Sequence, residues 1–192
     1  MARDLLGVWL LRWTPDGLSG GPIVETEAYG GPEDRASHAR AGQTRRTTPM
    51  FGEVGRAYVY LVYGMHECLN VVAYEPGREA GAVLIRAMAA EIGVDLIRSR
   101  RGRPTDPTDC LCSGPAMVCQ GLGVDRSFDG HDLTLGEGLW LAHPPARVTS
   151  MDRVGASSRI GAGSRIGVAY AGEWATRPWR FWLTAHPSVS RK

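Results

Sequence analysis

The stretch that decides the fold is YVYLVYGMHECLNVV, residues 58–72. Aromatic and β-branched residues fill Tyr58–Tyr63, which is typical of a strand. Residues 68–74 have the same character and predict the returning strand, and Gly64 permits the chain to reverse between them. The stretch therefore predicts an antiparallel β-hairpin with its tip at Tyr63–His66. Within it, Tyr60 and Tyr63 are three positions apart and fall on opposite faces of one strand.

The sequence on both sides of this hairpin predicts further strands and a few helices. Strand character is found at residues 8–13, 22–29, 81–87, 133–141 and 180–184. Helical patterns are found at residues 2–6, 89–101 and 113–122, and a helix is expected to begin at Pro32-Glu33-Asp34 and to carry His38. Ser113 is the candidate N-cap of the last predicted helix. Because strands and helices do not alternate strictly, the sequence predicts an α+β class.

Two glycine- and arginine-containing segments, 41–55 and 146–165, are expected to be loops. The second contains the near-repeat SRIG at 158–161 and 164–167, which is too short and too seldom repeated to indicate a solenoid. The length of 192 residues suits one domain, so we expect a single domain over residues 1–192.

Composition excludes several classes of protein. The chain is 43% hydrophobic and 22% charged, as in ordinary globular proteins, and it contains no apolar run of the roughly 18 residues that a membrane helix needs. The N-terminus lacks the features of a signal peptide. The four cysteines show no zinc-ligand spacing, so we expect reduced thiols and no metal. They are Cys68, Cys110, Cys112 and Cys119.

The net charge is only +2, so a uniformly basic nucleic-acid binder is not indicated. The arginines are instead clustered, and such clusters either neutralise phosphates or lie on a solvated surface. The clusters are Arg40, Arg45 and Arg46; Arg98, Arg100, Arg101 and Arg103; and Arg147, Arg153, Arg159 and Arg165.

Strand alternation places Glu25, Glu27 and Tyr29 on one face of the strand over 22–29. Two carboxylates on one face are costly to bury, so each must be solvated, paired or functional. Their separation along the strand, about 6.6–7 Å, lies within the range of inverting glycosidases. An arginine partner is the simpler expectation for Glu25. Taken alone, Glu27 is also most simply a solvated or paired side chain.

Aromatic side chains are the second candidate feature, because Tyr29 and the tyrosines of the hairpin fall on two strands that can be neighbours. A sheet-face aromatic cluster explains them without any function. An enzyme that extracts a base from duplex DNA also needs stacking faces for the base and a wedge for the gap left behind.

Several of these motifs, taken in order, resemble the alkyladenine DNA glycosylase family, also called 3-methyladenine or N-methylpurine glycosylases. The resemblance covers essentially the whole chain, and linked motifs in register are far more specific than one short pattern. The motifs are ETEAYGGPEDRASHARAG (25–42), YVYLVYGMHECLNVV (58–72), AVLIRA (82–87), LCSGPAMVCQGLGV (111–124), SFDG (127–130), RIGVAYAGEWATRPWRF (165–181) and HPSVS (186–190).

The resemblance implies a role for each matching residue. Glu27 matches the glutamate that activates the attacking water, and Arg86 matches the arginine that helps to hold this water and the glutamate. The residues that match those around the flipped purine are Tyr29, His38 and Tyr60, and Asn70 matches the asparagine that excludes the amine of normal guanine. Tyr63 matches the residue that enters the minor groove, with Met65 and His66 beside it. In that family, a second aromatic residue often occupies the position that His66 has in this sequence.

Together these features predict a monofunctional DNA glycosylase with a curved antiparallel sheet, flanking helices and a protruding β-hairpin. It would bind duplex DNA that contains alkylated purines and hydrolyse their glycosidic bond, as a cytoplasmic monomer with no cofactor, associated with the nucleoid if bacterial. Lys192 is the only lysine, which disfavours a Schiff-base lyase step. The alternatives are a non-catalytic nucleic-acid binding module of the same fold and a small-molecule nucleosidase. A nucleosidase would not need a wedge.

Overall fold

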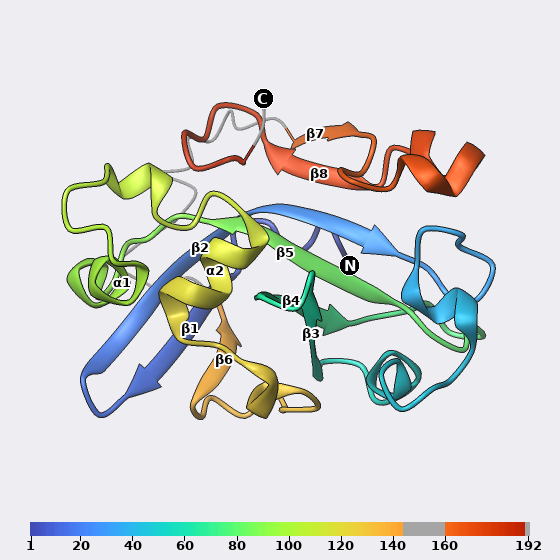
Figure 1. The fold of residues 1–192 in the computed structure, drawn as a ribbon, viewed down its shortest axis with the longest axis horizontal. Coiled ribbons are helices and arrows are strands. Elements are labelled where there is room, and N and C mark those ends of the chain that lie inside the picture. Colours follow the sequence, from blue (N-terminus) through green and yellow to red (C-terminus); the bar gives the residue numbers. More distant parts are fainter. Residues whose placement is uncertain (144–159, 191–192) are drawn as a thin grey trace.

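The computed structural model describes residues 1–143 and 160–190, and in these residues an eight-stranded antiparallel sheet curls around the core. The strand order is β3-β4-β5-β2-β1-β6, and β8 joins β2 to β7 (Figure 1). The strands are β1 (Trp9–Thr14), β2 (Gly17–Tyr29), β3 (Ala57–Val62), β4 (His66–Val72), β5 (Ala82–Met88), β6 (Leu139–Ala142), β7 (Ile160–Gly163) and β8 (Arg180–Leu183). The predicted α+β class with a curved antiparallel sheet is confirmed.

Strand β2 is the centre of the sheet and is 13 residues long. Its first half pairs with β1, and its second half lies between β5 and β8. The pairing with β5 shifts register on both sides of Glu25, as at a β-bulge. Glu25 and Glu27 therefore lie where β2 has a strand on each side, and both side chains are fully buried.

Two short helices cover one part of the sheet. They are α1 (Val94–Arg101) and α2 (Pro115–Leu122), and they pack against each other and against β2, β4 and β5. Ile97 and Leu122 from the helices meet Ile23, Ile85 and Met88 from the sheet, and all five are completely buried. This apolar layer fixes the middle of the sheet, and thereby the strands that carry the candidate site.

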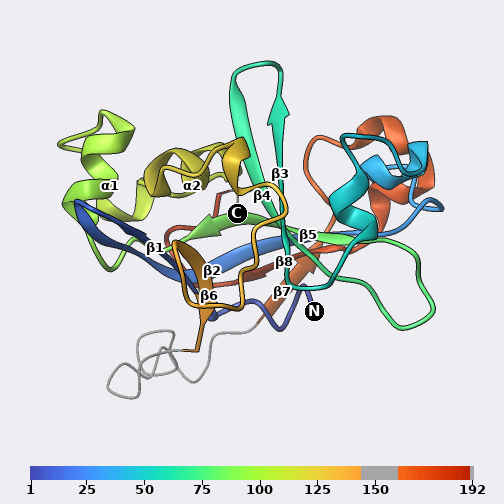
Figure 2. The same cartoon turned by 90° about the horizontal axis from the view of Figure 1, so that it is seen from below.

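The β3–β4 hairpin projects from the sheet (Figure 2). β3 and β4 pair with each other from Ala57–Val71 to Val62–His66, but β4 pairs with β5 only through Asn70–Val72. The outer half of the hairpin therefore has no strand neighbour beyond itself. The predicted protruding hairpin is confirmed.

Several expected elements differ from the structure. Residues 30–37 form turns instead of the start of an α-helix, and His38 begins a 3₁₀ helix, His38–Ala41, that Ser37 caps. The reason is that the Asp34 side chain accepts hydrogen bonds from the backbone N–H groups of Gly30 and Ala36, which holds a turn.

Two helix ends were also wrong. The helix expected over 89–101 begins only at Val94, after Gly93 in the left-handed region. Ser113 is not an N-cap: its hydroxyl donates to the Cys110 carbonyl, and Gly114 precedes the helix that begins at Pro115.

Two further expected elements are absent or shorter. Residues 2–7 are turns and not a helix. The expected strand over 133–141 is limited to β6, Leu139–Ala142.

Part of the loop expected over 146–165 is a strand. Ile160–Gly163 forms β7 and pairs with β8, although two of its four residues are glycine. The close approach explains both glycines, because a Cβ on Gly161 or Gly163 would meet the Trp182 ring at 2.4 Å or 3.2 Å. The rest of that expected loop, residues 146–159 with Arg147, Arg153 and Arg159, lies outside the described residues.

Candidate active site

Glu25 is a buried carboxylate that contacts the candidate site through Arg86, which lines the cavity. Oε1 accepts from Arg180 Nε at 2.6 Å and from Arg86 Nε at 3.2 Å, and Oε2 accepts from the Ser190 backbone N–H at 2.7 Å. Two arginines and an amide compensate for burial of this charge. Glu25 is thus a paired side chain, as the sequence suggested, and its contacts are structural.

Glu27 is held differently. Oε1 accepts from the backbone N–H of Ile166 at 2.7 Å, Oε2 accepts from the Tyr29 hydroxyl at 2.7 Å, and Arg86 Nη1 lies 3.4 Å from Oε2. An ionised carboxylate can accept about four hydrogen bonds, so these three contacts leave room for one more donor. Glu27 is fully buried and is not itself part of the cavity wall, but all three of its partners are.

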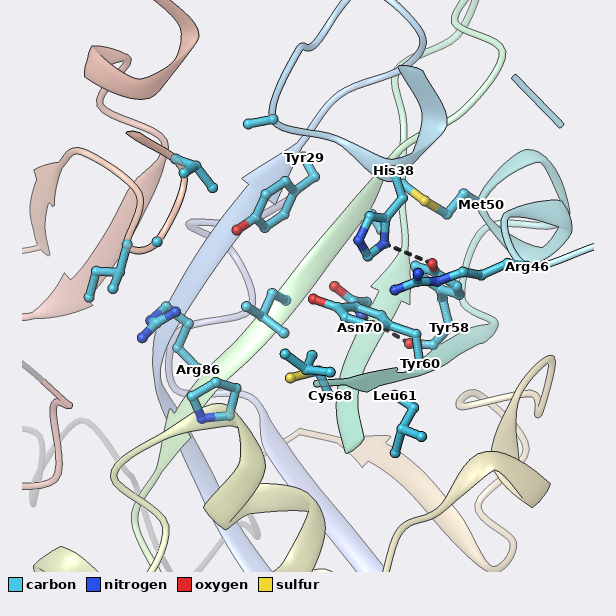
Figure 3. Close-up of a pocket in the computed structure, with 18 of the residues that line it drawn as sticks. Tyr29, His38, Arg46, Met50, Tyr58, Tyr60, Leu61, Cys68, Asn70 and Arg86 are labelled. Atoms are coloured by element: carbon cyan, nitrogen blue, oxygen red, sulfur yellow. Dashed lines mark hydrogen bonds between the residues drawn. The ribbon is translucent and has the colours of Figure 1, made fainter. Parts of the chain in front are cut away.

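A cavity of about 380 Å³ opens beside these carboxylates, and its lining includes several aromatic side chains (Figure 3). The ring of Tyr29 stands on one side, and the rings of His38 and Tyr60 stand on the other. His38 and Tyr60 meet edge to face, with ring centroids 4.5 Å apart and an interplanar angle of 82°. The cavity volume is sufficient for a purine, and its opposed rings provide stacking faces.

His38 is neutral at physiological pH. Its Nδ1 lies 2.9 Å from the hydroxyl of Tyr58, whose ring also contacts that of Tyr60. Burial, with smaller contributions from the charges of Arg46 and Arg40, lowers the pKa of His38 to about 4. A neutral imidazole has one donor and one acceptor nitrogen, so its second nitrogen remains available to a bound group.

Asn70 and Cys68 lie deeper in the cavity, on β4. Asn70 is almost completely buried and its Nδ2 donates to the backbone carbonyl of Tyr58 at 3.0 Å, which fixes the amide against β3. Burial raises the pKa of Cys68 to about 11, so this thiol is protonated at neutral pH. Both side chains restrict the shape of the cavity and carry no charge.

An ion pair behind Tyr29 ties two distant segments together. Arg165 Nη1 donates to Asp34 Oδ2 at 2.6 Å and Nη2 to Oδ1 at 3.0 Å, and neither side chain is exposed. The guanidinium also lies between the rings of Tyr29 and Trp179, with distances of 4.9 Å and 5.0 Å to their centroids. The pair therefore fixes the position of Tyr29. It also fixes the backbone amide of Ile166, the residue after Arg165, which donates to Glu27.

The hairpin tip is exposed, and Tyr63 at this tip also lines the cavity. Tyr63 is 92% exposed and Met65 is 68% exposed, and His66 is exposed at the start of β4. Tyr63 has φ = 51°, a left-handed conformation that is strained for a bulky residue. A glycine or asparagine would suit this position better on conformational grounds, so an exposed tyrosine there indicates a function for its ring.

Among residues 1–143 and 160–190, no group of three or more histidine, cysteine or acidic side chains could hold a metal ion. In the same part of the chain, no helix is long and apolar enough to cross a membrane. The structure brings Glu27, Arg86, Tyr29, His38, Tyr60 and Asn70 together, and it places Tyr63, Met65 and His66 at the hairpin tip.

Sequence reasoning missed four contributors: Tyr58, Asp34, Arg165 and Arg46. Tyr58 was recognised only as an aromatic of the hairpin. By sequence, Asp34 resembles a first-turn acid of a helix, and the two arginines belong to clusters that either neutralise phosphates or lie on a solvated surface. Strand alternation implies that Tyr58 is buried, and this could have identified it. The pairing of Asp34 with Arg165 leaves no signal in the sequence near either residue.

The site combines opposed aromatic faces, a buried carboxylate whose partners line the cavity, and an exposed ring on the hairpin. A hydrolase that draws a flat base out of a nucleic acid needs these parts. Comparison with known proteins gives the same class. The family profile described as "Methylpurine-DNA glycosylase (MPG)" matches residues 1–187.

Relatives of the chain occur in bacteria, archaea and mammals. The chain is 52% identical over 157 residues to a putative 3-methyladenine DNA glycosylase of Rubrobacter xylanophilus, with 80% of each protein covered. It is 42% identical to a putative 3-methyladenine DNA glycosylase of Methanocella arvoryzae, over 100% of this chain and 90% of that protein. It is 40% identical to the human DNA-3-methyladenine glycosylase over 99% of this chain, and spans 63% of the human protein's length.

The chain therefore belongs to the methylpurine-DNA glycosylase family. It is a monofunctional DNA glycosylase, a hydrolase that removes alkylated purines from DNA in base excision repair.

Proposed function

We propose that this protein binds damaged duplex DNA, flips an alkylated purine into the aromatic cavity and hydrolyses its N-glycosidic bond with a water activated by Glu27. The observation that carries the proposal is the buried Glu27 carboxylate, whose three partners Tyr29, Arg86 and Ile166 all line the cavity and which can accept one more hydrogen bond. A water bound there would donate one proton to Glu27 and direct its oxygen toward the cavity. The carboxylate then serves as the general base.

Arg86 supports this step from the opposite side. Its Nε is committed to Glu25, while Nη1 reaches Glu27. One guanidinium thus keeps the two carboxylates in a fixed relation and limits the side-chain motion of Glu27. As the glycosidic bond breaks, the sugar gains positive charge, which the fixed carboxylate stabilises without reorganisation. Alkylation at N3 or N7 makes the purine a cationic and good leaving group.

We infer that the purine stacks between Tyr29 on one side and His38 with Tyr60 on the other. The amide of Asn70, fixed by Tyr58, faces the deep end of the cavity, where it would obstruct the exocyclic amine of an undamaged guanine. Hypoxanthine and etheno-adenine lack that amine and are further candidate substrates. Both carry no net charge.

At the hairpin tip, we propose that Tyr63 fills the gap in the duplex, with Met65 and His66 beside it. The wedge role agrees with the strained, exposed conformation of Tyr63. The abasic sugar that remains after hydrolysis is then the product. No lyase step is assigned, because no lysine lies among the described residues.

The proposal is tested by incubating the protein with methylated duplex DNA and identifying released bases by chromatography. Release of 3-methyladenine and 7-methylguanine with intact strands supports it. Strand cleavage without added base or heat would contradict the monofunctional mechanism. Lesion-specific binding without any released purine would favour the second candidate, a nucleic-acid binding module of the same fold.

We further propose that the protein acts as a monomer and is located where the DNA is, in the cytoplasm and on the nucleoid if the cell is bacterial. One copy contains every side chain assigned above, so the reaction requires no second subunit. Light scattering of the free protein and of its complex with a short duplex tests this. A mass of two copies per duplex would contradict the proposed stoichiometry.

Replacing Asn70 by serine is expected to raise the release of undamaged guanine by about tenfold or more, because removing one close clash in a pocket is worth about 1–3 kcal/mol. The measurement is guanine release from unmodified DNA. Asn70→Leu, which keeps bulk without an amide, is the matched control and should still exclude guanine. Unchanged guanine release from the folded serine variant would show that Asn70 does not exclude guanine.

Replacing Tyr63 by alanine is expected to slow excision from duplex DNA by about 5- to 100-fold, since loss of one stacked ring costs about 1–3 kcal/mol. Excision of a lesion opposite a gap should suffer less, because less stacking must be broken there. Tyr63→Phe retains the ring and should behave like the parent protein. Single-turnover rates on both substrates decide the matter, and equal losses on both would contradict the wedge.

A further inference from the structure

Arg46 is a charged residue of the base cavity that has no part in the mechanism above. It lies beside Tyr58, Tyr60 and His38 (Figure 3), and its guanidinium carbon is 5.4 Å from the centroid of the Tyr60 ring. Among the side chains that the structure describes, no carboxylate forms an ion pair with it. A positive charge that no acid neutralises therefore stands at one wall of the cavity.

The neighbours of Arg46 respond to this charge. After burial, the charge of Arg46 is the largest influence that lowers the pKa of His38. Burial raises the pKa of Tyr58 to about 12, and the charge of Arg46 together with its hydrogen bond acts in the opposite direction. Both effects favour neutral over positively charged groups, or anionic over neutral groups, at this wall.

The negative charges on the other side of the cavity are already balanced. Glu25 is paired with Arg86 and Arg180, and Glu27 with Arg86. Tyr29, the opposite stacking face, carries the guanidinium of Arg165 at 4.9 Å. Tyr29 and Tyr60, two of the three rings that would hold a purine, thus each already have a cation near them. Arg165 does not line the cavity, so it lies behind Tyr29, whereas Arg46 reaches the cavity itself.

We propose that Arg46 is a specificity-determining residue, which weakens the binding of cationic purines relative to neutral purines of the same shape. This inference rests on the proposed function of the cavity. An unoccupied aromatic face attracts a cation through its quadrupole, but a ring that already contacts one guanidinium attracts a second cation less, and the two cations repel each other. Neutral lesions lose nothing in this arrangement.

Cationic and neutral lesions therefore depend to different degrees on binding in the cavity and on the ease of bond breaking. A methylated, cationic purine leaves its sugar readily, so it needs little help from binding once it reaches Glu27. A neutral lesion is a poorer leaving group and gains more from a long stay in the cavity. Arg46 shifts the binding preference toward the second kind and so broadens the range of purines that the protein can process.

A simple phosphate contact would behave differently. Arg46 is exposed enough to reach the DNA backbone, and a backbone contact would strengthen every complex by the same factor whichever base is flipped. The ratio of two dissociation constants separates these roles, because a common factor cancels in it. The two bases compared are 3-methyladenine and its neutral isostere 3-methyl-3-deazaadenine, which differ in charge, share their outline and lack the amine that Asn70 would obstruct.

The experiment measures Kd for duplexes with either base in the Glu27→Gln protein, in which excision is blocked, alone and with Arg46→Gln or Arg46→Lys added. Arg46→Gln is expected to shift the Kd ratio about two- to fivefold in favour of the cationic base. Arg46→Lys retains the charge and should stay near the parent ratio. Arg45→Gln is the matched control, because Arg45 is exposed and does not line the cavity, and it should not change the ratio.

An unchanged ratio in Arg46→Gln, with both complexes weakened equally, overturns the inference and makes Arg46 a phosphate contact. An equal shift in Arg45→Gln overturns it as well, because the effect would then be a general one of surface charge. If the Glu27→Gln protein binds neither base more tightly than undamaged DNA, both the inference and the proposed cavity fail. Failure of the inference alone leaves that lesion-specific binding intact.

Discussion

Glu27→Gln is expected to reduce the single-turnover rate of base release by at least about 10²–10⁴-fold and to leave lesion binding almost unchanged. Glutamine preserves the side-chain shape and can accept from the Ile166 amide, but it cannot take a proton from water. Arg86 retains its contact with Glu25, so no buried charge loses its only partner. Excision of 3-methyladenine and binding of an uncleavable duplex are measured on the same preparation.

Glu25→Gln is the matched control for this substitution, because it makes the same chemical change two residues away on the same strand. It removes the carboxylate that Arg86 and Arg180 share, so a fall in Tm is its main expected effect. Activity within a few-fold of the parent in the Glu27→Gln protein would reject Glu27 as the base. Catalytic loss in Glu25→Gln with unchanged Tm would transfer that role to Glu25.

Arg165→Met is expected to lower the free energy of unfolding by about 3–5 kcal/mol, because it leaves the buried Asp34 carboxylate without its cation. Asp34 keeps its hydrogen bonds from two backbone amides, but these do not neutralise it. Denaturant unfolding followed by tryptophan fluorescence gives the value. The double variant Asp34→Asn with Arg165→Met should lose less than the sum of the two single changes, since it leaves no unpaired charge.

The comparison for this prediction is Arg78→Met. Arg78 pairs with Glu33 at 2.6 Å, but both side chains are about half exposed, and exposed pairs contribute about 1 kcal/mol or less. Similar losses in the two variants would mean that burial of the Asp34–Arg165 pair has no energetic significance. If the double variant loses as much stability as the two single variants together, then the main contribution of Arg165 is the packing of its guanidinium between Tyr29 and Trp179, and not its charge.

The parts of the structure that the sequence predicted are those with a local pattern. The apolar run over 81–87 locates β5 within one residue, and the hairpin follows from two aromatic and aliphatic runs around Gly64. Strand alternation predicts that Glu27 and Tyr29 share one face of β2. The expectation that the hairpin tyrosines lie on a neighbouring strand is wrong, because β4 and β5 lie between β3 and β2, so their place beside Tyr29 follows only from the family resemblance. Their chemical roles remain predictions until the variants are measured.

The parts that the sequence did not predict depend on partners far away along the chain. Asp34 resembles a first-turn acid of a helix until its partner, 131 residues later, is known. The two glycines of β7 weaken any strand pattern, and only the Trp182 ring that packs over them explains why the strand forms. Arg46 cannot be distinguished from its neighbour Arg45 by composition, because only the fold turns one of them toward Tyr60.

The short attachment of the β3–β4 hairpin has a mechanical consequence. β4 is joined to β5 only at Asn70–Val72, and Tyr60 and Asn70 are on the same hairpin as Tyr63. If Tyr63 enters the duplex as proposed, a force on the tip acts as a torque on the hairpin, with Tyr63 at its far end and Asn70 where β4 joins β5. We therefore expect insertion of Tyr63 and adjustment of the cavity wall to be coupled, because the residues for both lie on the same hairpin.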